Sequence, residues 1–221
     1  MYMRIQRANK AFVFIFVMLA ALHCSGQTDV GASVYGALSA TTSGDNSTES
    51  PSYAAGGLLE LRHIFNPVRG FEATYSFNPA KQVYTYTGAI PASVVCAPPP
   101  GGCLQLPPTV SVSANAQEFT ADWIPSKTKG ALRPFGVLGA GVLLDVPSGG
   151  QSNTTTVTEP VFVYGVGMDW ARWKRFGLRV QYRGNLYKSP DMSPSFYSGM
   201  VPNRSLMLTN EPMAGVYFRL P

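Results

Sequence analysis

Apolar and polar residues alternate one by one along much of this chain. The clearest stretch is 71–78, where the apolar residues hold the odd positions: Phe71, Ala73, Tyr75 and Phe77. Successive side chains of a β-strand point to opposite faces, so a period of two predicts a strand with one apolar and one polar face. Two further stretches, 162–170 and 178–186, repeat the alternation clearly. The pattern therefore predicts an all-β protein.

Weaker alternation elsewhere brings the predicted strands to eight: 29–41, 53–65, 71–78, 115–124, 132–145, 162–170, 178–186 and 211–220. In 132–145, glycines and aliphatic residues fall on both faces, so the pattern does not say which face is which. The connections alternate in length, with short links at 66–69, 125–130 and 172–175 and long polar links at 42–52, 79–114, 146–158 and 188–210. Tight turns at one rim and long loops at the other are typical of antiparallel up-and-down outer-membrane barrels.

Charged residues gather on the polar faces of the predicted strands. They are Glu60, Arg62, Glu72, Glu118, Asp122, Asp169, Arg179, Arg183, Glu211 and Arg219. In a soluble β-sandwich, the alternative fold, such a face would meet water, whereas in a membrane barrel it lines the lumen. Aromatic residues near the strand ends, including Trp123, Trp170 and Trp173, favour the membrane barrel because they resemble the girdles at its two interfaces.

An eight-stranded barrel is just wide enough to be filled by side chains, and buried charges must be paired to be tolerated. We therefore expect the inner arginines and acids to form an ion-pair network that plugs the lumen. A narrow path for ions or small solutes is the alternative for the same residues.

The N-terminal residues have the layout of a secretory signal peptide. Arg4, Arg7 and Lys10 precede the apolar run 11–22, and small residues follow as far as Gly26. This order of basic, apolar and small residues predicts a signal peptide at 1–26, cleaved after Gly26.

The mature chain, 27–221, is then a single barrel domain with little excess charge. The signal peptide takes with it three of the 17 Lys and Arg and none of the 12 acids, which leaves 14 − 12 = +2. Because this balance is small and the basic residues are not clustered in one segment, we expect no nucleic acid as a partner.

Two cysteines remain in the mature chain, Cys96 and Cys103, in a Pro- and Gly-rich segment. A pair of cysteines in an exported chain predicts a disulfide. A thiolate metal site would need closer spacing or histidine partners, and the only histidine after the signal peptide is His63. We expect no metal and no cofactor, since no phosphate-binding or zinc-protease motif occurs.

A lipid-modifying enzyme is the second functional alternative, because barrels can carry a nucleophile and a base at the membrane surface. His63 is the only candidate for an imidazole base, and its position in the alternation places it on the lipid-facing side near a short turn. A histidine at a membrane interface is more often a polar anchor, so we expect a protein that is not an enzyme.

Four runs carry a family resemblance: 132–142 (LRPFGVLGAGV), 164–170 (YGVGMDW), 176–183 (FGLRVQYR) and 214–220 (AGVYFRL). They resemble the small outer-membrane β-barrel proteins of the OmpA and OmpX type. The resemblance implies an eight-stranded barrel in a Gram-negative outer membrane, in contact with its lipids and with the barrel-insertion machinery. The long loops then point to a structural or surface-interaction role with an unknown surface ligand.

Overall fold

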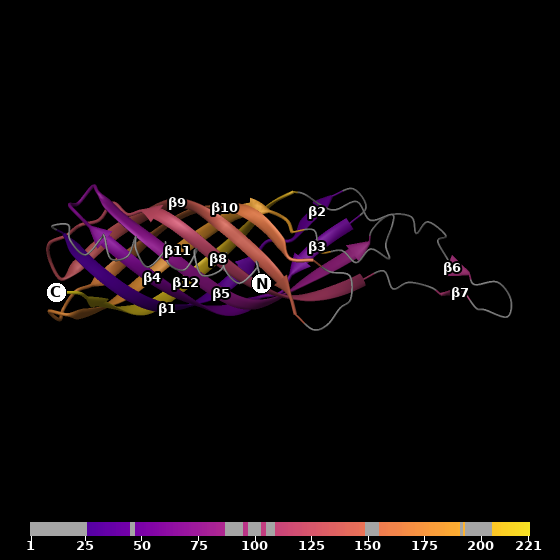
Figure 1. Ribbon diagram of the computed structural model, residues 1–221, viewed down its shortest axis with the longest axis horizontal. Coiled ribbons are helices and arrows are strands. Elements are labelled where there is room, and N and C mark those ends of the chain that lie inside the picture. The colour runs from indigo at the N-terminus through magenta and orange to yellow at the C-terminus, as the bar shows by residue number, and fades with distance from the viewer. Residues whose placement is uncertain are drawn as a thin grey trace, which may run out of the picture.

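Eight long strands form a closed antiparallel barrel in the computed structural model (Figure 1). They are β1 (Gln27–Ser39), β4 (Ala54–Ile64), β5 (Gly70–Tyr86), β8 (Thr109–Trp123), β9 (Leu132–Pro147), β10 (Val157–Trp170), β11 (Phe176–Lys188) and β12 (Leu206–Arg219). Each pairs with the next, and β1 pairs with β12, so the ring closes. The predicted eight-stranded up-and-down barrel is confirmed.

The structure describes residues 26–44, 47–86, 95–96, 103–104, 109–148, 155–190, 192 and 205–221. The predicted signal peptide therefore lies outside the described residues, except for Gly26. Within those ranges, no helix is long and apolar enough to cross a membrane.

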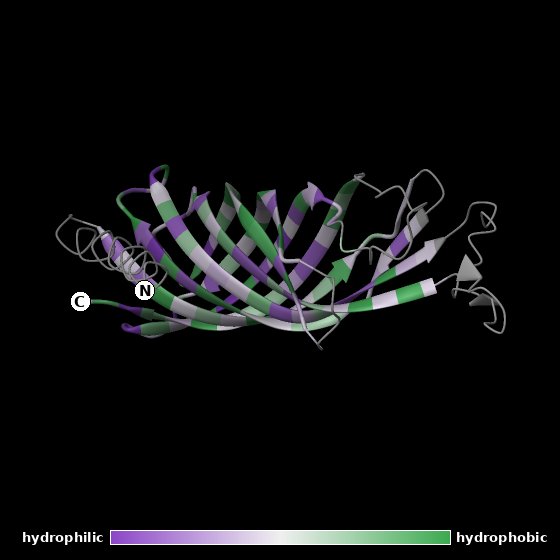
Figure 2. Cartoon of the chain, turned by 45° about the vertical axis from the view of Figure 1, so that its right-hand side comes forward, coloured by the Kyte–Doolittle hydropathy of each residue, from purple (hydrophilic) through white to green (hydrophobic). Residues whose placement is uncertain are grey.

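The alternation read from the sequence separates the inside of the barrel from the outside. On β5, Glu72, Thr74 and Ser76 are buried in the lumen, whereas Phe71 points outward and is 55% exposed. On β4, Leu59 points outward in the same way and is 58% exposed. Apolar and polar bands consequently alternate along the strands (Figure 2). This arrangement, polar inside and apolar outside, is the inverse of a soluble β-sandwich and suits a lipid surrounding.

The faces of β9, which the pattern left open, are settled by the structure. The odd-numbered Phe135, Val137 and Leu143 are buried, while Leu138 and Val142 are exposed on the outside. The neighbouring β10 adds two more buried inward residues, Val161 and Val163. Because this side of the lumen is apolar as well as the outer face, hydrophobicity alone could not distinguish them.

The sheet continues beyond the barrel at the long-loop rim. Two short strands, β2 (Thr42–Gly44) and β3 (Ser47–Pro51), form a hairpin, and β3 pairs with the outer part of β5 from Pro51↔Gln82 to Ser47↔Tyr86. Strands β5 and β8 stay paired as far as Thr85↔Thr109. The links expected at 42–52 and 79–114 thus contain strands, which backbone pairing holds together, and the inner face of the β5–β8 part is apolar at Tyr84 and Val112.

A separate two-stranded sheet lies between β5 and β8 in the chain. It consists of β6 (Val95–Cys96) and β7 (Cys103–Leu104), and its backbone register sets Cys96 opposite Cys103. The disulfide between them stays a prediction.

Candidate functional site

Three arginines lie inside the lumen with almost no access to solvent. Arg62 comes from β4, and Arg179 and Arg183 come from β11; their side chains are 0%, 1% and 0% exposed. All three follow from the alternation, because each holds an inward position between two outward residues. A charge so deeply buried requires partners of opposite sign.

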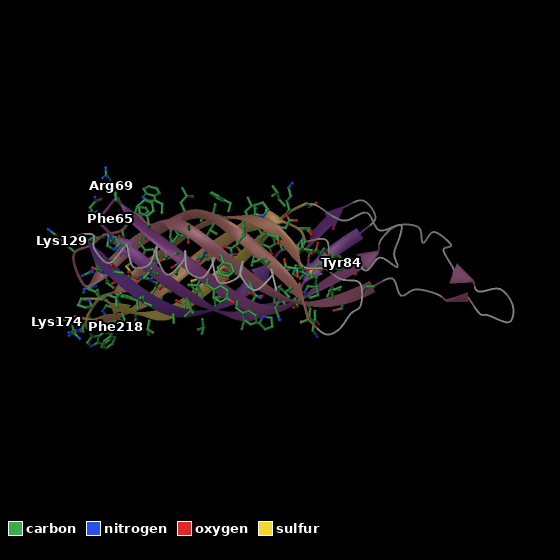
Figure 3. The ribbon with its side chains drawn as sticks, in the orientation of Figure 1. Phe65, Arg69, Tyr84, Lys129, Lys174 and Phe218 are labelled. Carbon is green, nitrogen blue, oxygen red and sulfur yellow. The ribbon has the colours of Figure 1, made fainter. Side chains whose placement is uncertain are left out.

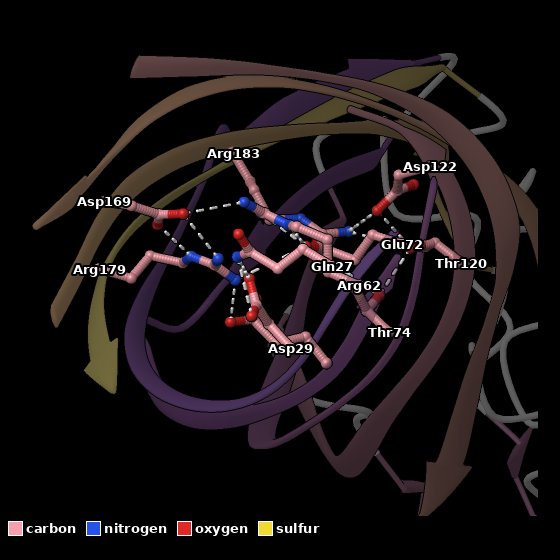
Figure 4. A network of polar contacts seen from close by, with 11 residues as sticks. Gln27, Asp29, Arg62, Glu72, Thr74, Thr120, Asp122, Asp169, Arg179 and Arg183 are labelled. Carbon is pink, nitrogen blue, oxygen red and sulfur yellow. Dashed lines mark hydrogen bonds and ion pairs between the residues drawn. The ribbon is translucent and has the colours of Figure 1, made fainter. Parts of the chain in front are cut away.

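Arg62 bonds to carboxylates on two other strands (Figure 4). Its Nε donates to Glu72 Oε2 at 2.6 Å, and its Nη2 lies 2.6 Å from the same oxygen. Its Nη1 reaches Asp169 Oδ2 at 3.4 Å. The guanidinium also stacks on Phe135, with its central carbon 4.1 Å from the ring centroid. Strands β4, β5, β9 and β10 are thereby linked across the lumen.

Arg179 completes the same cluster from β11. Its Nε and Nη2 donate to the two oxygens of Asp169 at 2.7 and 3.0 Å, a bidentate arrangement that is among the stronger ion pairs. Its Nη1 donates to Glu60 and lies 3.7 Å from Glu72 Oε2. Two arginines and three acids therefore form one connected network.

Arg183 forms a second cluster on the long-loop side of the first. Its Nη2 lies 3.3 Å from Glu118 Oε1 and 3.6 Å from Asp122 Oδ2. Asn185 Nδ2 donates to the other Glu118 oxygen at 2.8 Å. Glu211 lies opposite Arg183 in the β11–β12 register and is buried, but it makes no ion pair among the described residues.

The last predicted lumen residue, Arg219, lies at the short-turn rim and is 24% exposed. It pairs at 3.6 Å with Asp29, a buried acid on β1 that the sequence reasoning did not select. Asp145 on β9 was missed too, and it is also buried. Asp29 alternates with Gly31 and Ser33, a pattern that could have revealed it, whereas Asp145 lies on the strand whose faces were undecided.

A small cavity of about 30 Å³ lies in the lumen on the long-loop side of Arg183. Three acids line it, Glu118, Asp145 and Glu211, together with amide and hydroxyl side chains. Within the described part of the chain, no group of three or more His, Cys, Asp or Glu side chains is arranged to hold a metal ion.

A segment following β11 covers part of the long-loop mouth. Tyr84 Oη donates to the Pro190 carbonyl at 2.7 Å and accepts a hydrogen bond from Met192 N at 3.2 Å. Ser189 donates to Glu49 of β3. Met192 also packs against Tyr84 and Val112, so apolar contacts as well as hydrogen bonds hold the extended sheet to the barrel mouth.

His63 has the outward position expected of it, but it is only 7% exposed. Its Nδ1 is hydrogen-bonded to Thr28 Oγ1 at 2.8 Å, and its ring meets the edge of Phe65 with centroids 4.3 Å apart. Its Nε2 is buried and bonds to no side chain or backbone group among the described residues. The acid that orients a catalytic imidazole in triads is therefore not among its described contacts.

No protein-family model matches this chain, and no curated protein is similar to it in sequence. Solved structures are similar in fold. The outer-membrane protein OprG from Pseudomonas aeruginosa matches with a TM-score of 0.51 at 10% identity, over 90% of this chain and 97% of that one. Neisserial surface protein A matches at 0.49 and 14%, over 87% and 97%. Ail, the attachment invasion locus protein of Yersinia pestis, matches at 0.49 and 13%, over 89% and 100%.

This chain thus has the fold of the small outer-membrane barrels. Its outer face carries the apolar belt that such barrels present to lipid. Fold and belt together place the protein in the outer membrane of a bacterium.

Proposed function

We propose that this outer-membrane barrel is closed, catalyses no reaction, and serves as a scaffold that presents the sheet at its long-loop rim to a partner outside the cell. Ion pairs plug its lumen, and the sheet at the rim forms a platform for binding.

The single supporting observation for the plug is the burial of Arg62, Arg179 and Arg183. A water-filled path past these side chains would hydrate their guanidinium groups, as the polar lumen of a porin is hydrated. Instead each is at most 1% exposed and faces carboxylates from opposite walls. The ion pairs therefore take the space through which ions would pass.

The platform consists of β2, β3 and the outer parts of β5 and β8. Hydroxyl side chains pair on its outer face, such as Ser43 with Thr48 at 3.3 Å and Thr85 with Thr109 at 3.4 Å. The contacts of Tyr84 with Pro190 and Met192 hold its inner face against the barrel mouth. A rigid, exposed sheet suits recognition, because binding costs less ordering entropy than with a flexible loop.

The absence of catalysis is supported by the surroundings of His63. The imidazole lies against Phe65 and Thr28, and its access to solvent is small. A substitution such as His63→Gln should therefore leave the lipid A of expressing cells unchanged in mass. A change in lipid A that needs His63 would instead assign lipid modification to this protein.

A narrow channel is the second candidate, because the cavity lined by Glu118, Asp145 and Glu211 is a polar space in the long-loop half of the lumen. Single-channel recording of the refolded chain in planar bilayers distinguishes the two. We expect no stable conductance steps from the wild-type chain. Stable steps would overturn the plug and make the lumen acids selectivity groups.

The matched positive control is a variant that truncates two side chains of the plug and keeps its net charge. The Glu60→Ala/Arg179→Ala variant removes one acid and one base, and Asp169 keeps Arg62 as its partner. If the plug blocks conduction, this variant should conduct while still showing heat-modifiable gel mobility. Conduction that is equally absent from a folded variant would mean that another part of the lumen closes the barrel.

The platform has its own test, which is an epitope tag inserted between Gly44 and Ser47 in the β2–β3 turn. Antibody should label intact cells, because the proposal places this turn outside. Labelling only after permeabilisation would reverse the orientation of the barrel.

A further inference from the structure

The short-turn rim carries a concentrated positive charge that the barrel function does not use. Three turns form this rim: 65–69, 124–131 and 171–175. They hold six exposed basic residues and no acid: Arg69, Lys127, Lys129, Arg172, Lys174 and Arg175. Six of the 17 Lys and Arg and none of the 12 acids of the chain therefore lie on these three turns.

These six side chains have no carboxylate partners in the described part of the chain. All ion pairs of the described residues involve lumen arginines or Arg219. Arg69, Lys129 and Lys174 lie at the same end of the barrel, with Phe65 and Phe218 (Figure 3). An unpaired positive surface of this kind attracts anionic partners.

Aromatic side chains border the same rim. Those at least 39% exposed are Phe65, Phe71, Trp123, Trp170, Trp173, Phe176 and Phe218. On the third turn, Trp173 stacks on Phe176 with centroids 4.6 Å apart and meets Trp170 at 5.8 Å. Girdles of this kind mark the depth of lipid headgroups in outer-membrane barrels. The cations that flank them in sequence therefore reach the headgroup layer.

Backbone hydrogen bonds join the three turns to one another and to the end of β12. Ser126 N donates to Pro67 O at 2.8 Å, and Ala171 N donates to Ala131 O at 2.7 Å. Arg219 N, at the end of β12, donates to Arg175 O at 2.6 Å. The cations are thus carried on a fixed frame, and little backbone entropy is lost when a ligand binds there.

We propose that the six basic residues of the short-turn rim form a binding site for anionic phospholipid headgroups of the adjacent leaflet. Clusters of four to eight Lys and Arg beside a membrane segment are typical of anionic-lipid recognition, and each charge adds attraction to an anionic surface. The short turns keep the cations beside the girdle, which favours lipid over an acidic polymer farther from the membrane. Phosphatidylglycerol is the probe of this chemistry, and the site is independent of whether the lumen conducts.

The chain has a built-in reporter, because its three tryptophans, Trp123, Trp170 and Trp173, all lie at this rim. Bromine on a lipid chain quenches tryptophan fluorescence on contact. The barrel is reconstituted in phosphatidylcholine bilayers with increasing brominated phosphatidylglycerol, and in parallel with brominated phosphatidylcholine. We expect the anionic lipid to be enriched around the tryptophans by about fivefold or more, and the enrichment to fall in high salt.

The decisive variant is Arg172→Gln/Lys174→Gln, which removes the two charges flanking Trp173. Its matched control is Lys81→Gln/Lys188→Gln, two exposed lysines at the opposite rim. The first variant should lose about fivefold or more of the enrichment, and the control should keep it. Heat-modifiable mobility checks that both fold.

Three results would overturn the site. Equal quenching by the two lipids at low salt shows no headgroup preference, and enrichment that survives the Arg172→Gln/Lys174→Gln change assigns it to other residues. Cosedimentation with peptidoglycan sacculi that needs these cations, without lipid enrichment, assigns the six basic residues to the cell wall instead.

Discussion

Replacing Arg62 with methionine should destabilise the barrel by about 3–5 kcal/mol, because the change leaves the buried Glu72 carboxylate without its main partner. Arg62 is fully buried, holds Glu72 through two nitrogens at 2.6 Å, and lies on the ring of Phe135. After the change, Glu72 keeps only a 3.7 Å contact with Arg179. Asp169 keeps its bidentate pair with Arg179, so the loss falls mainly on Glu72.

Removing both members of the pair should cost far less than removing Arg62 alone. In the Arg62→Met/Glu72→Leu variant no carboxylate is stranded, and apolar replacements of buried ion pairs are often neutral or stabilising by about 1–4 kcal/mol. The free energies of unfolding are measured in urea by tryptophan fluorescence in lipid vesicles, as a double-mutant cycle. The Arg219→Met variant is the control. Its pair with Asp29 is 3.6 Å long, the arginine is 24% exposed, and Asp29 keeps two hydrogen bonds from Gln27, so about 1 kcal/mol is expected.

Two results would refute this reasoning. A loss below about 1 kcal/mol for Arg62→Met would show that water reaches the site, which contradicts its burial. A double variant as unstable as the sum of the two single variants would show that the charges do not act as a pair.

Three further predictions concern other parts of the barrel. Gly141→Ala should cost about 1–3 kcal/mol in the same urea assay, because the added methyl group meets a backbone carbonyl of β8. The control is Gly57→Ala, whose methyl group faces open space; a cost below about 1 kcal/mol there would exclude a general effect of replacing glycine. Tyr84→Phe removes the hydroxyl that anchors the segment over the mouth, so proteases should cut that segment faster on the folded barrel; unchanged cleavage would show that other contacts hold it. Thiol titration should find Cys96 and Cys103 blocked until reductant is added, and free thiols in the oxidised preparation would exclude the disulfide.

Period-two alternation was enough to predict the eight strands of the barrel, because an outward residue faces lipid and an inward residue faces a crowded polar lumen. Phe71 and Glu72 differ in chemistry for that reason, and the same argument selected the ten charged lumen positions. It did not resolve β9, where Val137 inside and Leu138 outside are both aliphatic. Alternation also gave no signal for β2 and β3, whose Ser and Thr side chains suit either face.

The barrel, its membrane-facing side and the asymmetry of its rims can all be predicted from the sequence, because they depend on local periodicity and on the lengths of the connections. Which charges meet one another is visible only in the folded barrel. Arg62 and Asp169 are 107 residues apart in the chain, and Arg179 and Glu60 are 119 apart. Their contact depends on closure of the ring and on the register of every strand between them. Closure also ties three separate turns into one basic rim, because it brings together ends that no local pattern connects.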